Sequence, residues 1–341
     1  MSVTVIRPGL ASTFQDCGRH GHQHLGMPVG GAMDLRAHQL ANLIAGNAAD
    51  VATLEITLLG PTLRFDAPAL IAMAGADLSP RLNGLPAALG RPLVVYAGDI
   101  LSFGERRNGV RCYLAWHGGI DLPWVMGSQS TYLRGGLGGF EGRALRKDDV
   151  LQMKSALRPD ALEALENDLN ARAIYLPATL ANNPRPALRV MRGPHTPLFT
   201  EEAWNDFLNS SYRIANESDR MGYRLQGPTL ALKENRQLLS ECATFGSIQV
   251  PADGLPIVLM ADRQSIGGYP KIGHVATVDL PQLAQQMPGE EIRFEEISLA
   301  QAQQLDNLRE EALARLESSL EGMRARIARC VAGAPAGWLQ A

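Results

Sequence analysis

Cysteine and lysine are both scarce in this 341-residue chain. Its four cysteines, Cys17, Cys112, Cys242 and Cys330, form no CxxC pair and have no spacing typical of a metal site. We therefore expect free thiols in a reducing compartment. Lysine supplies only four of the 32 cationic residues, and the net charge is −3. That balance gives no positive field for nucleic acid or an anionic membrane.

Long apolar runs and common catalytic motifs are also missing. The longest apolar stretch, near Ala69 to Ala76, is far shorter than the ~20 residues that span a bilayer. The first residues have no basic segment followed by an apolar run, so we expect no signal peptide and a cytoplasmic location. The sequence contains no GxxxxGK[ST], GxSxG or HExxH motif, which excludes the usual P-loop, nucleophile-elbow and zincin sites.

Short β-prone runs and turn dipeptides dominate what is present. Runs such as 54–58 and 92–96 are separated by turn chemistry at close intervals. Asn83-Gly84, Asn108-Gly109 and Asp253-Gly254 are typical of hairpins, because type I′ turns need positive φ at both central positions. Many short strands with few helices favour a barrel over an alternating parallel sheet.

Four segments carry helix signals. Asp34 can cap a helix that ends at Gly46-Asn47, 159–172 places leucines on one side, and Thr200 can open a short helix. In 298–332, apolar residues recur at steps of three and four, which predicts a long amphipathic helix. Its apolar face could pack on its own domain or on another protein chain.

The alternating His20, His22 and His24 would share one face of a strand and could then bind a metal. An intervening glycine and the lack of suitably spaced carboxylates favour a solvated loop instead.

Four glycine-rich loops carry hydroxyls, amides and charges, at 14–34, 118–143, 218–224 and 262–271. Glycine lets a backbone approach a ligand closely, and exposed N–H groups in such turns bind anions. Tight turns and structural Asp–Arg pairs would explain any single loop equally well. Four of them in one chain favour the convergence of some at a shared pocket.

These loops also carry a family resemblance. The opening with Gln15-Asp16 and Gly31-Ala32-Met33-Asp34, the central Gly127-Ser128-Gln129-Ser130-Thr131 and the later Ser218-Asp219-Arg220-Met221-Gly222-Tyr223-Arg224 are similar to motifs of the 5-oxoprolinase C-subunit family, also called allophanate-hydrolase-subunit-2-like or biotin-dependent carboxyltransferase-like. Gln249-Val250-Pro251 and the segment from Asp262 to Pro270 resemble further family motifs. The resemblance runs in order from about residue 5 to 295.

The resemblance implies a mainly β fold with two tandem cyclophilin-like β-barrel domains, a few helices and a C-terminal helix. We expect the N-terminal barrel at 1–155, a helical connector at 156–186, the C-terminal barrel at 187–297, and the C-terminal helix and tail at 298–341.

The resemblance further implies a subunit of an ATP-dependent complex that opens the lactam of 5-oxo-L-proline to L-glutamate. The A and B subunits of 5-oxoprolinase would be its partners, and ATP would bind on this chain or on a partner. We expect a small-molecule substrate, no nucleic acid and no membrane. One alternative is the carboxyltransferase component of a biotin-dependent urea or amide carboxylase, in which biotin would be the cofactor. Another is a regulatory protein that antagonises a kinase inhibitor.

Within that resemblance, the loops supply the candidate site residues. Guanidinium groups suit a substrate carboxylate, hydroxyls and glycine turns suit an anion pocket, and carboxylates, amides and lysine suit proton or amide chemistry. The catalytic candidates are Asp16, Asp262, Gln264 and Lys271. The substrate-binding candidates are Gln15, Asp34, Ser128, Ser130, Thr131, Gly138, Gly139, Arg220, Arg224, Gly267 and Gly268, and no metal ligand is predicted. We expect these residues to converge in a cleft between the two barrels or at the seam with a partner.

Overall fold

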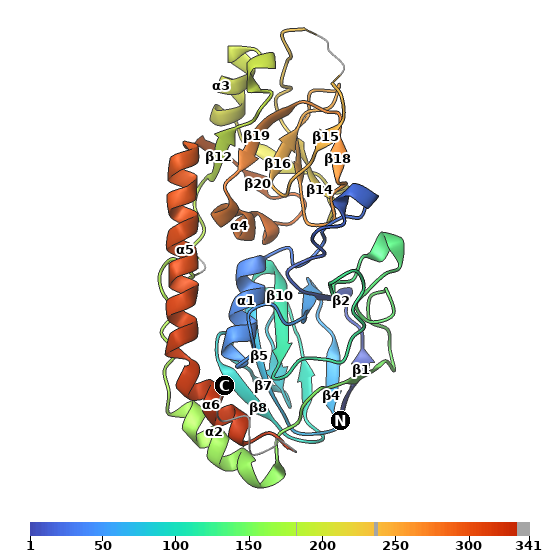
Figure 1. Ribbon diagram of the computed structural model, residues 1–341, viewed down its shortest axis with the longest axis vertical. Coiled ribbons are helices and arrows are strands. Elements are labelled where there is room, and N and C mark those ends of the chain that lie inside the picture. The colour runs from blue at the N-terminus through green and yellow to red at the C-terminus, as the bar shows by residue number, and fades with distance from the viewer. Residues whose placement is uncertain (182, 235–237, 333–341) are drawn as a thin grey trace. The chain divides into compact units, whose positions relative to one another are not determined.

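A computed structural model describes residues 1–181, 183–234 and 238–332 (Figure 1). Contacts divide the chain into two compact units. Unit 1 consists of Met1–Gly18, Asp34–Ala181 and Glu311–Ala341, and unit 2 of Arg19–Met33 and Asn182–Glu310. These units differ from the predicted domains at three places. Residues 19–33 group with unit 2, residues 156–181 group with unit 1, and the predicted C-terminal helix is divided after residue 310. Residue 182 of the predicted connector and residues 333–341 of the predicted tail lie outside the described residues.

Unit 1 contains two antiparallel sheets, with the strand orders β11-β1-β4-β9-β6-β7 and β2-β3-β10-β5-β8. The elements are β1 (Ser2–Arg7), β2 (Ala11–Gln15), α1 (Leu35–Ile44), β3 (Thr53–Thr57), β4 (Thr62–Phe65), β5 (Ala69–Asp77), β6 (Arg81–Leu82), β7 (Leu85–Pro86), β8 (Pro92–Val95), β9 (Ile100–Ser102), β10 (Asn108–Trp116), η2 (Leu133–Gly135), β11 (Val150–Gln152), η3 (Pro159–Ala161) and α2 (Leu162–Asn170).

The core of unit 1 lies between its two sheets. Val3 and Phe65 come from the first sheet, and Ile56 and Leu114 from the second. Helix α1 packs on β5 and β10 (Figure 1). Strand β5 is therefore covered on both faces, which explains its near-continuous apolar run.

The predicted C-terminal helix is confirmed, with one interruption. Helix α5 (Leu299–Ser319) is followed by α6 (Glu321–Arg329) after a break at Leu320. The apolar stripe is buried from Ala312 onward, and the segment after α6 pairs with Leu157 of unit 1. From Ala312 onward the segment therefore packs on its own chain rather than on another protein, as the first of the two sequence-based interpretations expected.

Unit 2 contains an eight-stranded sheet, with the order β20-β13-β14-β17-β16-β19-β12-β21, and a two-stranded sheet, β15-β18. The elements are η1 (Gln23–Leu25), β12 (Leu188–Arg192), η4 (Thr196–Leu198), α3 (Glu201–Asn209), β13 (Tyr212–Ile214), β14 (Gly222–Gln226), β15 (Glu241–Cys242), β16 (Ser247–Gln249), β17 (Ile257–Leu259), β18 (Ile266–Gly267), β19 (Lys271–Val275), η5 (Thr277–Asp279), α4 (Leu280–Ala284), β20 (Glu291–Ile292) and β21 (Phe294–Glu296).

The eight-stranded sheet of unit 2 nearly closes into a barrel. Its two end strands, β20 and β21, are separated in the sequence by Arg293 alone. This short connection brings the two edges of the sheet together around a core that includes Ile248, Val258 and Phe294. The prediction of a mainly β chain with a few helices and a C-terminal helix is confirmed.

Local signals were accurate except at one turn. Asn83-Gly84 connects the antiparallel β6 and β7 with positive φ at both residues, and Asp253-Gly254 lies in the β16–β17 connection. Asp34 and Thr200 cap α1 and α3 as predicted. The prediction of a hairpin at Asn108-Gly109 is wrong. These residues begin strand β10, and Asn108 pairs with Asp77 of β5 next to a register shift. The Asn-Gly dipeptide here belongs to a β-bulge and not to a turn that reverses the chain.

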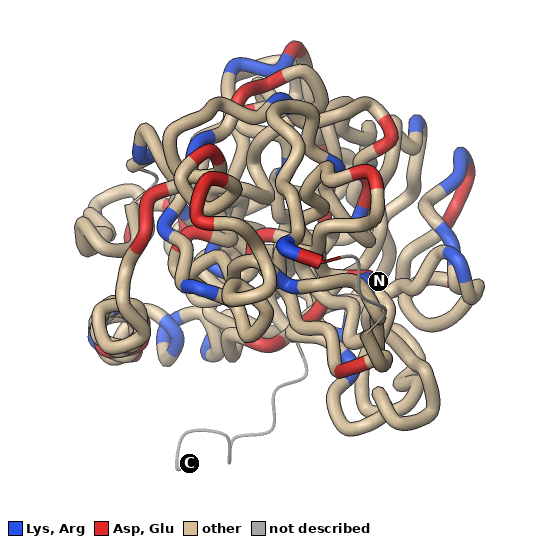
Figure 2. Tube along the Cα trace, turned by 90° about the horizontal axis from the view of Figure 1, so that it is seen from above, with Lys and Arg blue, Asp and Glu red and all other residues tan. Residues whose placement is uncertain are grey.

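Charges of both signs are interspersed along the chain (Figure 2). Among the described residues, no helix has the length and apolar character needed to cross a membrane.

Candidate functional site

In unit 1, Asp16 is the centre of a buried hydrogen-bond network. The Ser128 and Ser130 hydroxyls donate to its carboxylate at 2.8 Å and 2.5 Å. The backbone N–H groups of Gly18 and Gln129 also donate to it, at 2.8 Å and 2.6 Å. The first and second predicted loops are thus brought together by residues more than 100 positions apart. A buried carboxylate that accepts this many hydrogen bonds is closely fixed in place.

The other candidates of these loops support the same junction. The Gln15 amide donates to the Thr131 carbonyl at 3.2 Å, and the Thr131 N–H donates to the Phe14 carbonyl at 2.9 Å. The backbone N–H of Gly139 donates to the Gln129 carbonyl. A Cβ on Gly139 would lie 1.9 Å from the Thr131 hydroxyl oxygen, so glycine is required for this close approach. Gly138 accepts the backbone hydrogen bond of Gly142, within the same turn.

Asp34 serves α1. Its carboxylate accepts the N–H of Ala37 at 2.9 Å, and its own N–H donates to the Tyr113 hydroxyl at 2.7 Å. That hydroxyl donates in turn to Glu55. Burial, with Glu55 and Asp34 nearby, raises the pKa of Tyr113 well above its ordinary value, so the phenol remains a donor. Asp34 is fully buried, and its side chain acts as the N-terminal cap of α1.

In unit 2, Arg220 and Asp262 form a bidentate ion pair. Arg220 donates to the two carboxylate oxygens at 2.9 Å and 3.1 Å, and to the Gly31 carbonyl at 2.6 Å. The Asp262 N–H donates to the Arg220 carbonyl at 2.8 Å. The third and fourth predicted loops are therefore joined, and here the structural Asp–Arg pair is what forms.

Arg224 lies apart from this pair. It is on β14, where Tyr223 and Leu225 point into the core and Arg224 is exposed between them. Its backbone N–H donates to the Ser218 hydroxyl at 3.0 Å, which ties the strand to the preceding turn.

Lys271 is a buried cation at the start of β19. Its ammonium donates to Glu241 of β15 at 3.1 Å, and His195 Nε2 lies 3.5 Å from the same carboxylate oxygen. His195 Nδ1 accepts the Lys271 backbone N–H at 3.1 Å. In the neutral imidazole this hydrogen bond leaves the proton on Nε2, directed at Glu241.

A cavity of about 370 Å³ opens beside this group. It is lined by Arg192, Gly193, Pro194, Glu241, Cys242, Thr244, Ser247, Lys271, Gly273 and His274. Burial, with Arg263 nearby, lowers the pKa of His274, so its imidazole is neutral at pH 7. Arg192 is paired with Glu296 at 2.8 Å and stacks over Trp204. Among the lining residues, Lys271 and Glu241 therefore form an ion pair with each other, whereas Arg192 pairs with a residue outside the lining.

Gln249 and Gln264 lie close to Lys271. Gln249 of β16 is directly opposite Lys271 in the β16–β19 register, and Gln264 Nε2 lies 3.4 Å from Gln249 Oε1. A Cβ on Gly267 would lie 2.5 Å from Gln249 Nε2, so glycine allows β18 to cover Gln249. Gly268 follows on the same turn, close to the carbonyl of Leu238.

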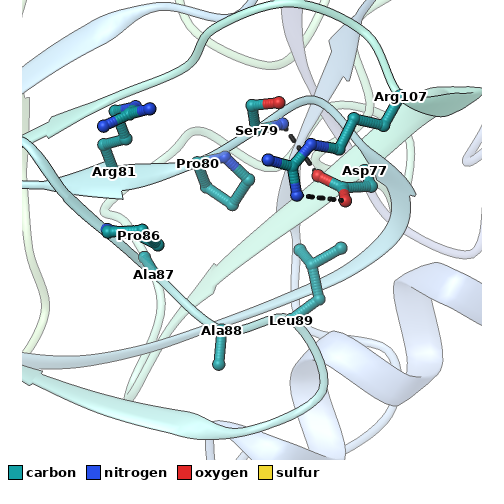
Figure 3. Close-up of a pocket in the computed structure, with 9 residues that line it drawn as sticks. All are labelled: Asp77, Ser79, Pro80, Arg81, Pro86, Ala87, Ala88, Leu89 and Arg107. Atoms are coloured by element: carbon teal, nitrogen blue, oxygen red, sulfur yellow. Dashed lines mark hydrogen bonds and ion pairs between the residues drawn. The ribbon is translucent and has the colours of Figure 1, made fainter.

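A second cavity, of about 270 Å³, lies in unit 1 beside the β6–β7 hairpin (Figure 3). Its acid, Asp77, accepts the Ser79 N–H at 2.8 Å and lies 3.7 Å from Arg107. The remaining lining is mostly proline, alanine and leucine, and none of the predicted site residues lies there. The acid of this cavity is therefore already paired with neighbouring groups.

The predicted candidates thus fall into two sets on different units. Asp16, Gln15, Ser128, Ser130, Thr131, Gly138, Gly139 and Asp34 belong to unit 1, whereas Arg220, Arg224, Asp262, Gln264, Gly267, Gly268 and Lys271 belong to unit 2. Their convergence in one cleft stays a prediction. No cluster of three or more metal-ligating side chains occurs in the described ranges, and the His20–His24 loop is mostly exposed.

Sequence reasoning missed Glu241, His195 and the role of Gln249. Glu241 and His195 are in no recognisable motif, and they reach Lys271 only through the fold. Gln249 is in the Gln249-Val250-Pro251 motif, which is the one signal for its position in the sequence.

Comparison with known proteins gives a consistent family match. Residues 25–296 match the model described as carboxyltransferase domain, subdomain A and B. The C subunit of 5-oxoprolinase from Escherichia coli K12 is 39% identical over 298 residues, which cover 87% of this chain and 92% of that protein. The protein of the same name from Haemophilus influenzae is 37% identical, over 86% of this chain and 91% of its own length.

The fold also has a solved counterpart. The crystal structure of Kluyveromyces lactis urea amidolyase superposes with a TM-score of 0.83 at 31% identity, over 92% of this chain. This chain spans only 20% of that protein, so the match concerns one part of a larger enzyme.

Proposed function

The chain belongs to the family of carboxyltransferase domains, subdomain A and B, and from this premise we propose that it is a subunit of an ATP-dependent 5-oxoprolinase. The complex opens the lactam of 5-oxo-L-proline to L-glutamate. The A and B subunits of 5-oxoprolinase are its proposed partners, and the cytoplasm is its proposed location. Support comes from two relatives of that name that this chain matches over about nine-tenths of their length.

The observation that carries this proposal is the buried Lys271 ammonium beside a cavity of about 370 Å³. That volume lies in the range of small-molecule sites. The substrate is a small ring with one carboxylate and one amide. Lys271 offers a positive charge for the carboxylate. The amides of Gln249 and Gln264 lie beside Lys271, next to the lining rather than in it.

ATP supplies the driving force for opening a stable five-membered lactam. Transfer of the γ-phosphoryl group to the lactam oxygen releases ADP and gives an imidate-like phosphate, which water attacks more readily. Addition of one water molecule and cleavage of the C–N bond give an acyl phosphate. Hydrolysis by a second water molecule then releases phosphate and leaves glutamate. In total, 5-oxoproline, ATP and two water molecules give glutamate, ADP and phosphate. The phosphoryl donor binds on this chain or on a partner.

The paired acids take positioning roles in this proposal. Asp262 is held by Arg220 at the start of the loop that carries Gln264, and Asp16 joins two loops of unit 1. Both carboxylates are already engaged by these hydrogen bonds. Catalysis is then mainly the orientation of the substrate by fixed donors.

Reconstitution tests the proposal. The chain is co-expressed with the A and B subunits of the same organism, and 5-oxoproline-dependent ADP release and glutamate formation are measured. We expect turnover only when this chain is included. Full turnover without this chain, or none with all three proteins present, contradicts the proposal.

A carboxyltransferase acting on urea or another amide is the second candidate. The family description and the similarity to urea amidolyase favour it. Such a reaction needs biotin on a carrier, so an avidin blot of the purified complex and a urea-dependent ATPase assay distinguish the two. Biotin with urea-dependent activity would replace the first proposal by the second.

A further inference from the structure

The ion pair in the unit 2 cavity is strongly asymmetric. The Lys271 side chain is 7% exposed, whereas that of Glu241 is 51% exposed. Glu241 belongs to a two-residue strand whose one partner among the described strands is β18, in the small two-stranded sheet. A buried cation is thus neutralised by a carboxylate that water already reaches. Glu241 itself would lose little on leaving the pair, because about half of its side chain is already in water. Lys271 would then need another anion, because an unpaired buried charge is costly.

A second donor beside Lys271 lacks a partner. The Gln249 side chain is 1% exposed, and its Nε2 has no hydrogen-bond partner among the described residues. Gln249 stands opposite Lys271 in the strand register, and it lies two residues from Ser247, which lines the cavity. Residues two apart on a strand share a face. A buried donor without a partner is unfavourable, and an acceptor that reached it would remove that cost.

The surrounding groups favour an anion at this position. His195 directs Nε2 at the same Glu241 oxygen that Lys271 contacts. The Thr244 and Ser247 hydroxyls line the cavity, 2.7 Å from each other. Lys271 therefore offers an ammonium to the cavity, and Gln249 lies next to it beneath β18, outside the lining. The carboxylate that pairs with Lys271 comes from the short strand β15.

We propose that the Glu241 carboxylate is an internal substitute for the anionic group of a small-molecule ligand, which displaces it from Lys271. The chemical class is a small carboxylate, and its assignment to 5-oxoproline rests on the proposed function. Glu241 then competes with every ligand for Lys271. The ion pair with Lys271 lowers the pKa of Glu241, so this competitor is fully ionised at neutral pH.

The scarcity of lysine makes the site directly observable. The full chain is labelled with ¹³C-lysine, and the Cε signals of Lys147, Lys154, Lys233 and Lys271 are followed by NMR. A Lys271→Arg variant identifies the Lys271 signal. The chain is titrated separately with 5-oxoproline and with inorganic phosphate, so a response to the first assigns a carboxylate and a response to the second a phosphoryl group.

Glu241→Gln is the decisive variant. We expect its Lys271 signal to titrate at concentrations about two- to fivefold lower than in the original chain, because an exposed ionic competitor is removed. Glu241→Ala, which also removes the acceptor, should give at least the same gain. Glu291→Gln is the matched control, since Glu291 is 56% exposed and paired with Arg213 on the same unit, outside the cavity lining.

Two results would overturn the proposal. One is a Lys271 signal that responds to neither probe in any variant. The other is an equal response in the original chain, Glu241→Gln and Glu291→Gln. A reconstituted complex without 5-oxoprolinase activity would contradict the proposed function alone, because a Lys271 response that is strengthened in Glu241→Gln would still establish the anion site.

Discussion

Asp16 in unit 1 and Lys271 in unit 2 are both buried charges, but their surroundings differ. The Asp16 carboxylate accepts hydrogen bonds from two serine hydroxyls and two backbone N–H groups. The Lys271 ammonium has one described partner, a half-exposed glutamate, and faces a cavity. A charge that is saturated by fixed donors holds a structure together. A charge whose single counter-ion can leave is available to a ligand.

Removal of Asp16 should have the largest effect on stability. Asp16→Ala leaves the Ser128 and Ser130 hydroxyls and the Gln129 N–H without their acceptor, and we expect a loss of about 3–5 kcal/mol in the free energy of unfolding. Urea denaturation measures this. Asp160→Ala is the control, because Asp160 is exposed and 3.9 Å from its arginine. A loss as small as that of the control would remove the distinction between the two charges.

Removal of Lys271 should act on catalysis instead. In the reconstituted complex, Lys271→Met should lower kcat/KM for 5-oxoproline about 10²- to 10³-fold, as expected when a fixed electrostatic contact to the reactant is deleted. The free energy of unfolding should change by less than about 1 kcal/mol, because the lost partner is half exposed. Lys154→Met, at an exposed lysine, should leave the rate unchanged. Retained activity in Lys271→Met would exclude a substrate contact.

Buried histidine makes unit 1 sensitive to acid. Burial lowers the pKa of His38 to about 4, against an ordinary value near 6.5. The unfolded chain therefore binds more protons than the folded chain between these values, so stability is full above about pH 6.5 and falls as the pH falls toward 4. We expect His38 to account for a loss of about 2 kcal/mol between pH 7 and pH 5.

The variant His38→Asn should remove that part of the pH dependence. Urea denaturation at the two pH values measures it, and His20→Asn in an exposed loop is the control. Burial also lowers the pKa of His117 and His274, so a smaller acid sensitivity should persist. An unchanged pH profile in His38→Asn would show that His38 does not remain neutral.

The two helix caps should give the smallest effects. Asp34→Ala in unit 1 and Thr200→Ala in unit 2 each remove the acceptor of one N–H, at Ala37 and Ala203, and should cost about 1 kcal/mol of unfolding free energy. Asp34→Asn should retain most of the stability and the full kcat/KM, since asparagine also caps helices. A large loss of kcat/KM in Asp34→Asn would instead support the prediction that Asp34 binds the substrate.

Much of the fold could be predicted because its signals are local. Capping residues and leucine spacing predicted α1, α2 and α3, and glycine dipeptides marked two of three hairpin connections. Asn108-Gly109 misled because the same dipeptide suits a bulge, and only the partner strand decides between the two.

The candidate site was predictable in part. The loops that carry Asp16, Ser128 and Ser130 converge, as do those that carry Arg220 and Asp262. The ion-pair partner and the exposure of each charged residue were not predictable. Arg220 and Asp262 neutralise each other, Arg224 is exposed, and Glu241 was not a candidate at all.

By itself, the sequence determined which segments form helices, where several strands turn, and which polar loops resemble those of a known family. Backbone propensity and turn chemistry act within a few residues, so they can be read along the chain. The tertiary structure alone decided which charge meets which partner. Asp16 reaches Ser128 across 112 positions, and Lys271 reaches Glu241 across 30, through strand register and packing. Burial then makes one charge a fixed support and leaves the other exchangeable.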